Sequence, residues 1–502
     1  MAPVLGQDLV VDSGTTNITS SANYDNTYIG SNSTASNNLL NVYGSGVVLS
    51  NSTNVYVGYA GSGNSMVISN RGSVVSFAGF IGYATNSSNN SVLVTGTNSA
   101  WTNTVNLFVG GEGSSNSLVI SNKGSVASSG GVIGSQSTSS NNSVLVAGTN
   151  SAWNSGEALA VGSVGSGNSL VISNGGSVLA QSGAIGDVSS NNSVLVTGTN
   201  SAWTNTAELY VGLAGSSNSL AITNGGSVIN SNGYIGSYSI SSNNIVIVTG
   251  TNSAWKNTGD LRVGNNGSSN SLVISNQGSV VSVNGVIGTT GTSSNNSVLV
   301  TGTNSAWTNT GDFYVGLNGS SNSLVISNGG SVVDTFGYIG KNSDSSNNSV
   351  LVTGTNSAWT NTGNLSIGNG GSGNSLVISN EGSVVNSNGF IGRNLGSSNN
   401  SVTVTGTNSA WTNSLALVIG LSGSSNSLVI SNQGCVFSVN GIIGDTGTSS
   451  NNSVLVAGTN SAWTNTGNLL VGNGGSSNSL IISNGGSAVS YTHLTLPTKR
   501  IV

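Results

Sequence analysis

The side chains that could carry out acid–base or metal chemistry are few and scattered in this sequence. The 502 residues include 13 acidic side chains, one histidine and one cysteine. Three carboxylates, Glu208, Asp260 and Asp312, recur at intervals of 52 residues. On stacked strands, two coils would separate neighbouring carboxylates by about 9.6 Å, close to the spacing of the acid pair in inverting glycoside hydrolases. The same place in the repeat also holds Ala158 and Ala416, so we interpret these carboxylates as a solvated edge.

No other group of residues in the sequence indicates an enzyme or a bound cofactor. The single cysteine, Cys435, stands where other repeats have serine, as at Ser383 and Ser487, and the single histidine is His493. One cysteine and one histidine cannot form a metal cluster or a disulfide framework. The glycines lie in turns and make neither a phosphate-binding loop nor the GGxGxD pattern of calcium-binding solenoids. We therefore predict a non-enzymatic protein with no cofactor and no metal ion.

The composition argues against two classes of partner. The formal net charge is −5 and charged residues make up only 4% of the chain, so we expect no basic surface for nucleic acid. No run of about 18 apolar residues occurs, so we predict no membrane span. Apolar residues are 35% of the chain and are rich in Val, Ile and Leu, which favour strands.

The most prominent feature of the sequence is a repeat that ends in tryptophan. The sequence GTNSAW occurs eight times, at intervals of 52 residues except for one interval of 50. Leu49 takes the place of tryptophan in an earlier copy. Because leucine can replace it, we predict that this residue lies in a hydrophobic core as a structural spine. The spine tryptophans are Trp101, Trp153, Trp203, Trp255, Trp307, Trp359, Trp411 and Trp463.

Each 52-residue repeat divides into two similar halves of about 26 residues. Most halves open on Asn-Ser and an apolar triplet, pass through Gly, and close on an aliphatic residue followed by Gly, as in 90–110 and 116–134. Within the triplets, the outer two positions stay large and apolar while the middle one varies, which is the period of two of a β-strand. The sequence therefore predicts an all-β fold, a single elongated parallel β-helix (β-solenoid) with about 26 residues per coil and a 52-residue double-coil repeat. A nine-bladed propeller is the rival fold, and the 26-residue half-repeat argues against it.

Two elements of the repeat have expected structural roles. The opening Asn recurs in every coil from Asn38 to Asn478, where stacked side chains can form a hydrogen-bonded ladder. The Asn-x-Gly segments, such as 70–72, suit turns with positive φ.

Two sets of aromatic residues are expected to point outward from the strands. They could stack on sugars or contact a partner surface, or they could be ordinary cross-strand pairs. The first set is Tyr56, Phe108, Tyr210 and Tyr314, and the second is Tyr28, Phe80, Tyr234, Tyr338 and Phe390.

The repeat also predicts the domain organisation. Residues 1–37 are expected to form an N-terminal entry segment and a first partial coil, and residues 38–490 a solenoid of about 18 coils. Residues 491–502 (YTHLTLPTKRIV) depart from the repeat and contain the only histidine. We interpret them as a non-native read-through tail.

The segment 248–282, VTGTNSAWKNTGDLRVGNNGSSNSLVISNQGSVVS, resembles the bacterial type V secretion (autotransporter)/PEP-CTERM-associated repeat. The resemblance extends over roughly residues 28–490. It implies an exported β-solenoid that is secreted or held at the bacterial outer surface, as a non-enzymatic surface or matrix scaffold with an adhesin-like role. The alternative is a carbohydrate-binding or polysaccharide-processing β-helix protein. The expected partners are surface glycans or other cell-surface proteins.

Overall fold

The computed structural model describes residues 6–490, and it consists of short parallel strands joined by turns. Each coil contains a first strand of five residues, a second of four and a third of three, for example β11 (Ser91–Thr95), β12 (Ala100–Asn103) and β13 (Leu107–Val109). Each strand pairs in parallel and in register with the same strand of the coils before and after it. The predicted fold class is confirmed: the chain is an all-β parallel β-solenoid of about 18 turns with about 26 residues per coil.

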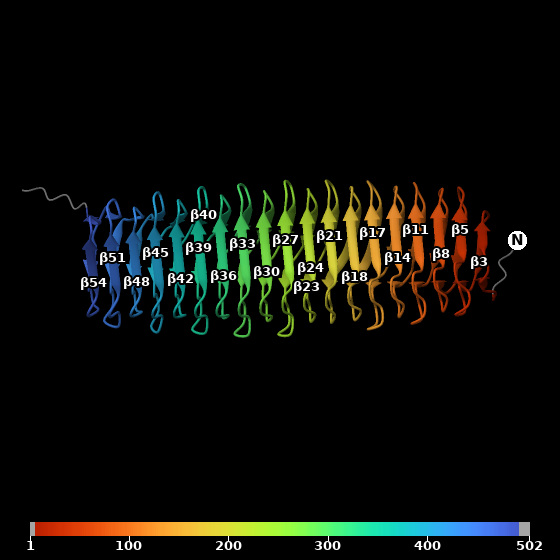
Figure 1. Ribbon diagram of the computed structural model, residues 1–502, viewed down its shortest axis with the longest axis horizontal. Coiled ribbons are helices and arrows are strands. Elements are labelled where there is room, and N and C mark those ends of the chain that lie inside the picture. The colour runs from red at the N-terminus through yellow and green to blue at the C-terminus, as the bar shows by residue number, and fades with distance from the viewer. Residues whose placement is uncertain (1–5, 491–502) are drawn as a thin grey trace, which may run out of the picture. The chain divides into compact units, whose positions relative to one another are not determined.

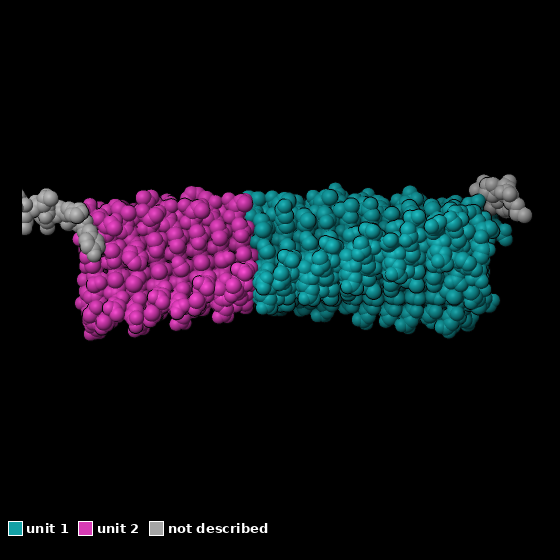
Figure 2. Space-filling model, turned by 90° about the horizontal axis from the view of Figure 1, so that it is seen from above, with its two compact units in different colours: residues 1–283 teal, residues 284–502 magenta. Residues whose placement is uncertain are grey.

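The chain divides into two compact units, Met1–Val283 and Asn284–Val502, which Figure 2 shows in different colours. In the first unit, the strands β5, β8, β11 and β14 lie side by side in that order (Figure 1). The first strands of this unit are β2 (Thr15–Ile18), β5 (Leu39–Tyr43), β8 (Ser65–Ser69), β11, β14 (Ser117–Ser121), β17 (Ser143–Ala147), β19 (Ser169–Ser173), β21 (Ser193–Thr197), β24 (Ser219–Thr223), β27 (Ile245–Thr249) and β30 (Ser271–Ser275). The second strands are β3 (Ala22–Tyr24), β6 (Val48–Asn51), β9 (Ser73–Ser76), β12, β15 (Ser125–Ser128), β22 (Ala202–Asn205), β25 (Ser227–Asn230), β28 (Ala254–Asn257) and β31 (Ser279–Ser282). The third strands are β1 (Leu9–Val11), β4 (Thr27–Ile29), β7 (Val55–Val57), β10 (Gly79–Ile81), β13, β16 (Gly131–Ile133), β23 (Leu209–Val211), β26 (Gly233–Ile235) and β29 (Leu261–Val263). In two coils the second and third strands are continuous, as β18 (Ala152–Val161) and β20 (Ser177–Ile185).

The second unit repeats the same three-strand coil. Its first strands are β33 (Ser297–Thr301), β36 (Ser323–Ser327), β39 (Ser349–Thr353), β42 (Ser375–Ser379), β45 (Ser401–Thr405), β48 (Ser427–Ser431), β51 (Ser453–Ala457) and β54 (Ser479–Ser483). Its second strands are β34 (Ala306–Asn309), β37 (Ser331–Asp334), β40 (Ala358–Asn361), β43 (Ser383–Asn386), β46 (Ala410–Asn413), β49 (Cys435–Ser438), β52 (Ala462–Asn465) and β55 (Ser487–Ser490). Its third strands are β32 (Gly285–Ile287), β35 (Phe313–Val315), β38 (Gly337–Ile339), β41 (Leu365–Ile367), β44 (Gly389–Ile391), β47 (Ala416–Ile419), β50 (Asn440–Ile443) and β53 (Leu469–Val471).

The N-terminal segment contributes more strands than the sequence indicates. We expected only a partial coil within residues 1–37, yet β2, β3 and β4 form all three strands of a coil there, and β1 pairs with β4. These strands lack the Asn-Ser opening, which is why the repeat pattern does not reveal them. The predicted tail, 491–502, lies outside the described residues. Within residues 6–490, no helix has the length and hydropathy of a membrane span.

Alternation along each strand builds the core. In β11, Val92 and Val94 are 2% and 0% exposed, while Leu93 between them is half-buried on the outer face. The turns that follow rely on residues that tolerate positive φ. In the turn after β8, Asn70 and Arg71 have φ of 48° and 70°. Both values lie in the left-handed region, which asparagine tolerates better than most other residues with a side chain.

The opening asparagines form the predicted ladder inside each unit. The backbone N–H and side-chain Nδ2 of Asn90 both donate to Oδ1 of Asn116, at 2.9 and 3.0 Å, and Asn116 donates in the same way to Asn142. Asn90, Asn116 and Asn142 are 0% exposed. The ladder also explains the glycine that follows each third strand. A Cβ on Gly82 would lie 2.1 Å from Nδ2 of Asn116, so no larger residue fits beside the ladder.

The tryptophans fill the core by packing against a glycine of the neighbouring coil. All eight predicted spine tryptophans are 0% exposed. Trp101 pairs in register with Val74 and Val126, so large and smaller side chains alternate along the column. A Cβ on Gly79 would lie 2.5 Å from Cζ2 of Trp101. The 52-residue period therefore arises because a coil with a large indole needs a neighbouring coil with a glycine at the facing position.

A column of buried polar side chains runs beside the indoles. In one pair of coils, Ser76 Oγ accepts a hydrogen bond from Trp101 Nε1 at 3.2 Å and donates to Asn103 Oδ1 at 2.8 Å. Ala180 stands at the equivalent position two repeats later, paired with Asn205. Nε1 of Trp203 and both polar side-chain atoms of Asn205 consequently have no hydrogen-bond partner.

We expect Ala180→Ser to stabilise the first unit by about 1–2 kcal/mol. The new hydroxyl would accept from Trp203 and donate to Asn205, as Ser76 does for its neighbours, and thus satisfy groups whose burial is otherwise costly. Chemical denaturation monitored by circular dichroism measures the change. Ser76→Ala is the matched control, with a loss of similar size. A destabilised Ala180→Ser variant would contradict this account of the column.

Candidate functional site

The middle residues of the third strands form one outward column. Tyr28 pairs in register with Tyr56, Tyr56 with Phe80, and Phe80 with Phe108. Their ring centroids are 5.1, 5.1 and 5.0 Å apart, and successive rings are parallel within 12°. The two aromatic sets seen in the sequence are therefore interleaved, with members of one alternating with members of the other. Each ring covers a face of the next, so an added ligand cannot stack between them.

A second, shorter row of aromatic rings lies beside this column. Tyr59 and Tyr83 each follow the glycine that ends a third strand, and their centroids are 5.0 Å apart. They meet the rings of Tyr56 and Phe80 edge to face, at 79–87° and centroid distances of 5.1–5.2 Å. Such perpendicular contacts bring the positive ring edge to the negative ring face.

Four of the other predicted aromatic residues form two separate pairs, while Phe390 lies in register with Ser366 and Val418. Tyr210 stacks on Tyr234 at 5.0 Å, and Tyr314 stacks on Tyr338 at 5.2 Å. Tyr56 and Tyr338 are only 9% exposed, which differs from the outward exposure expected for them. Their neighbours in the adjacent coils cover them.

Burial raises the pKa of four tyrosines in these columns. It raises the pKa of the Tyr56 hydroxyl above its ordinary value of 10.0, and a hydrogen bond from Asn54 Nδ2 at 2.8 Å opposes part of that shift. Burial also raises the pKa of Tyr28, Tyr210 and Tyr338. Burial therefore favours the uncharged form of these four side chains.

Three cations lie over rings in the middle of third strands, one in the first unit and two in the second, and we did not foresee them from the sequence. Lys341 Nζ is 3.5 Å from the centroid of Tyr338, and the Arg393 guanidinium carbon is 4.7 Å from that of Phe390. Arg262 is 5.9 Å from Tyr234 in the first unit. Lys341 and Arg393 both occur three residues after the aromatic ring, behind Ile-Gly, and that spacing is the signal that could have identified them.

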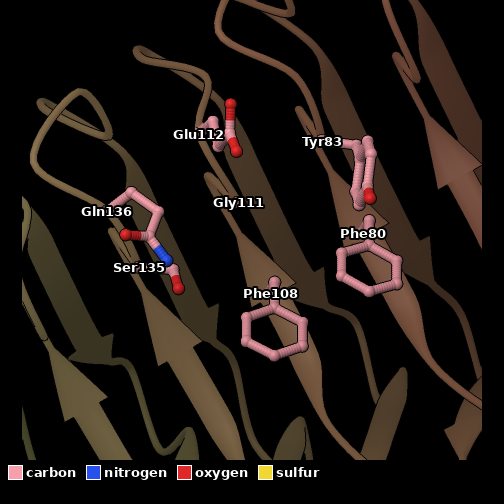
Figure 3. A pocket seen from close by; sticks show the side chains of 7 residues that line it. All are labelled: Phe80, Tyr83, Phe108, Gly111, Glu112, Ser135 and Gln136. Atoms are coloured by element: carbon pink, nitrogen blue, oxygen red, sulfur yellow. The ribbon is translucent and has the colours of Figure 1, made fainter.

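A hollow of about 210 Å³ opens beside Phe108, at the end of the long aromatic column. Gly111 is the residue of its coil that is equivalent to Tyr59 and Tyr83. The second row of rings therefore does not continue into this coil. Figure 3 shows the open space at Gly111, with Tyr83 to one side and Glu112 and Gln136 to the other. The lining residues are Phe80, Tyr83, Phe108, Gly111, Glu112, Ser135 and Gln136.

The recurring carboxylates are engaged in local contacts. Asp260 pairs with Arg262 at 3.2 Å, and Asp312 accepts a hydrogen bond from the Tyr314 hydroxyl at 2.9 Å. Among residues 6–490, no three His, Cys, Asp or Glu side chains come together as metal ligands would.

A column of aliphatic side chains lies on the outer face of the first strands. One such residue per coil is half-buried there, and the sequence pattern alone showed only that this position varies. In the first unit this outer aliphatic column consists of Val67, Leu93, Val119, Leu145, Val171, Leu195, Ala221, Ile247 and Val273.

Comparisons with known proteins give little information on family. No family model and no curated protein match the chain. One similar solved structure is entitled "Crystal structure of TibC-catalyzed hyper-glycosylated TibA55-350 fragment". It is 14% identical, the alignment covers 73% of this chain and 99% of that chain, and the TM-score is 0.41. At this identity and TM-score, the likeness supports no conclusion about the family or function of the chain.

Proposed function

We propose that this chain is a non-enzymatic scaffold that is exported to the bacterial surface or extracellular matrix. In this role it resembles an autotransporter passenger, and its repeated outer faces mediate adhesion. The expected partners are other cell-surface proteins or surface glycans. The resemblance of the 52-residue repeat to exported bacterial repeats supports the location.

The outer aliphatic column is the observation on which the adhesive role rests. It offers the same apolar contact once per coil, at the spacing of about 4.8 Å between neighbouring strands. Half-buried apolar surface that is continuous over many coils on an outer face can serve as an interaction site. Repetition also lets many weak contacts act together on one partner.

The chemistry of the acidic residues supports a non-enzymatic role. Asp260 is held by Arg262 and Asp312 by Tyr314. A hydrolytic pair needs two carboxylates that both face the substrate and hold different protonation states. The contacts made by Asp260 and Asp312 are those of surface residues that stabilise their own strands.

Antibody labelling of intact cells tests the location. Antibodies raised against residues 6–490 should label intact cells or the surrounding matrix of the bacterium that expresses the native gene. Mild protease treatment of intact cells should remove that signal. Labelling that appears only after lysis would contradict an exported scaffold.

Threonine substitutions in the outer aliphatic column test adhesion. The triple variant carries Leu93→Thr, Leu145→Thr and Leu195→Thr. Another coil already has threonine at the equivalent position, at Thr403. We expect the triple variant to fold and to lose adhesion of protein-coated beads to cells. The matched control is Ala127→Thr with Ala147→Thr. The adjacent coil carries Thr102 beside Ala127, and coils two away carry Thr95 and Thr197 at the place of Ala147. Equal adhesion by the two variants would contradict a role for the column.

Carbohydrate binding is the second candidate function, and the aromatic columns favour it. The test measures binding of the purified protein to a panel of immobilised polysaccharides. We expect Tyr210→Ala to weaken any such binding if the rings contact the sugar. Binding that is unchanged by this substitution and by Phe108→Ala would place the sugar site elsewhere.

A further inference from the structure

Residues that directly follow the third-strand glycine occupy equivalent places in successive coils. The backbone N–H of Tyr83 donates to the Gly58 carbonyl oxygen at 2.9 Å. Gly111 donates to Gly82, and Lys341 to Gly316, at the same distance. The parallel register of the third strands thus brings each of these residues beside the aromatic column.

The side chain at this place covers the ring of its own coil. Tyr83 meets Phe80 edge to face, Lys341 places Nζ over Tyr338 at 3.5 Å, and Arg393 lies over Phe390 at 4.7 Å. Gly111 has no side chain, and the 210 Å³ hollow lies where one would be. The hollow is smaller than the pockets of about 300 Å³ or more that take drug-sized ligands.

The charges around the hollow favour a cation as its occupant. The aromatic rings of Phe80, Phe108 and Tyr83 line it, and ring faces attract cations. The Glu112 carboxylate stands at its rim (Figure 3). Within residues 6–490, the one ion pair is that of Arg262 with Asp260, so Glu112 has no cationic side chain within 4.0 Å. An uncharged apolar guest would remove water from this carboxylate without replacing its hydrogen bonds.

The protein itself shows which chemical group fits this geometry. In the second unit, Lys341 is a butylammonium chain lying over a ring at the equivalent place of its coil, and burial is the main cause that lowers its pKa. We propose that the Gly111 hollow binds the alkylammonium group of a lysine side chain presented by a partner protein. The ammonium lies over Phe108 and donates a hydrogen bond to the Glu112 carboxylate. This proposal deepens the adhesive role, and it rests on that role only for the source of the lysine.

Titration with small amines tests the proposal on the full chain. The probe is Nα-acetyl-lysine methylamide, followed by ligand-detected NMR at low salt, and the neutral analogue is Nα-acetyl-norleucine methylamide. We expect saturable binding of the lysine probe, weaker binding as salt is added because exposed charges are screened, and no saturation with norleucine. Equal binding of the two probes would show an apolar site and overturn the proposal. Tighter binding of tetramethylammonium than of the lysine probe would contradict a lysine side chain as the occupant of the hollow.

Variants of the lining residues locate the site. Gly111→Tyr extends the row of Tyr59 and Tyr83 into the hollow and should abolish binding of the lysine probe. Glu112→Gln, and Phe108→Val by analogy with Val132 of the next coil, should each raise its Kd about threefold to fivefold, as expected for the loss of an exposed ion pair or cation–π contact.

The control is Glu157→Gln, which removes one exposed charge outside the hollow and should leave the Kd unchanged. Because Glu112→Gln alters no packing, its result stands even if Gly111→Tyr fails to fold. An unchanged Kd in Glu112→Gln would overturn the proposal. Antibody labelling of intact cells tests the proposed location separately. A protein that does not bind the lysine probe can still be exported, and a protein that is not exported can still bind the probe.

Discussion

Asp334→Asn is expected to stabilise the second unit by about 4 kcal/mol at pH 7 and to have little effect near pH 4. Asp334 belongs to the buried polar column beside the tryptophans and is 1% exposed. Its Oδ2 accepts a hydrogen bond from Trp359 Nε1 at 2.7 Å. Burial raises its pKa from 3.8 to about 8, the hydrogen bond from Trp359 lowers it in part, and the charge of Asp312 raises it further.

The geometry of neighbouring coils shows why this carboxyl holds a proton. Asn386 donates from Nδ2 to Asn413 Oδ1 at 2.7 Å while its own Oδ1 accepts from Trp411 Nε1. Asp334 faces Asn361 in the same register. Its Oδ1 has no partner, and neither has Oδ1 of Asn361. A proton on Asp334 supplies the donor that asparagine provides elsewhere, whereas an ionised carboxylate would be buried with Trp359 Nε1 as its one donor and with Oδ1 unpaired.

The sign of the pH dependence follows from the direction of the shift. Between pH 3.8 and about 8, the folded protein holds a proton on Asp334 that the unfolded chain has released. The stability contributed by this proton is therefore fully present below pH 3.8 and falls as the pH rises to about 8. The loss is about 1.4 kcal/mol per pH unit in this window. Asparagine carries no titrating proton, so the variant gains relative to the wild type as the pH rises.

Denaturation of the wild type and of Asp334→Asn at pH 4, 6 and 8, with hydrogen exchange of peptides from 331–361, measures the effect. Asp344→Asn is the matched control, because it removes an exposed carboxylate and should change stability by less than about 0.5 kcal/mol. A constant difference between the wild type and Asp334→Asn at all three pH values would mean that Asp334 is ionised in the folded state.

Trp255→Ala should destabilise the first unit by about 3–5 kcal/mol. The indole is 0% exposed, and its Nε1 donates to Asn230 Oδ1 at 2.7 Å. A Cβ on Gly233 would lie 2.8 Å from Cζ2 of this ring, so the neighbouring coil has no side chain that could fill the cavity. The substitution also leaves the buried Asn230 oxygen without this donor.

Two further variants separate packing from hydrogen bonding in this prediction. Trp203 has no partner for its Nε1, so Trp203→Ala should cost about 1 kcal/mol less than Trp255→Ala. Trp255→Leu should keep part of the packing, because Leu49 is 0% exposed at the equivalent position. Chemical denaturation by circular dichroism gives the three values. A loss below about 1 kcal/mol in Trp255→Ala would show that the indole column does not stabilise the coils.

The sequence was sufficient to predict the coil and its core. Three features of the sequence indicate which side chains point inward. They are the 26-residue period, the alternation within Val92–Val94 and the replacement of tryptophan by Leu49. These features depend on local geometry, since side chains alternate along any strand. The opening asparagines were predictable for the same reason, because an identical residue at the same place in every coil must meet its own copies.

The tertiary structure decided which residues of different coils meet. Tyr28, Tyr56 and Phe80 are separated by 28 and then 24 residues, so a regular spacing assigned them to two sets. The hydrogen-bond register between strands brings them into one column, because the turns absorb the difference in length. The cation over Tyr338, the empty place at Gly111 and the proton on Asp334 depend on that register in the same way. Sequence periodicity fixed which face each residue takes, and inter-strand pairing determined its neighbours on that face.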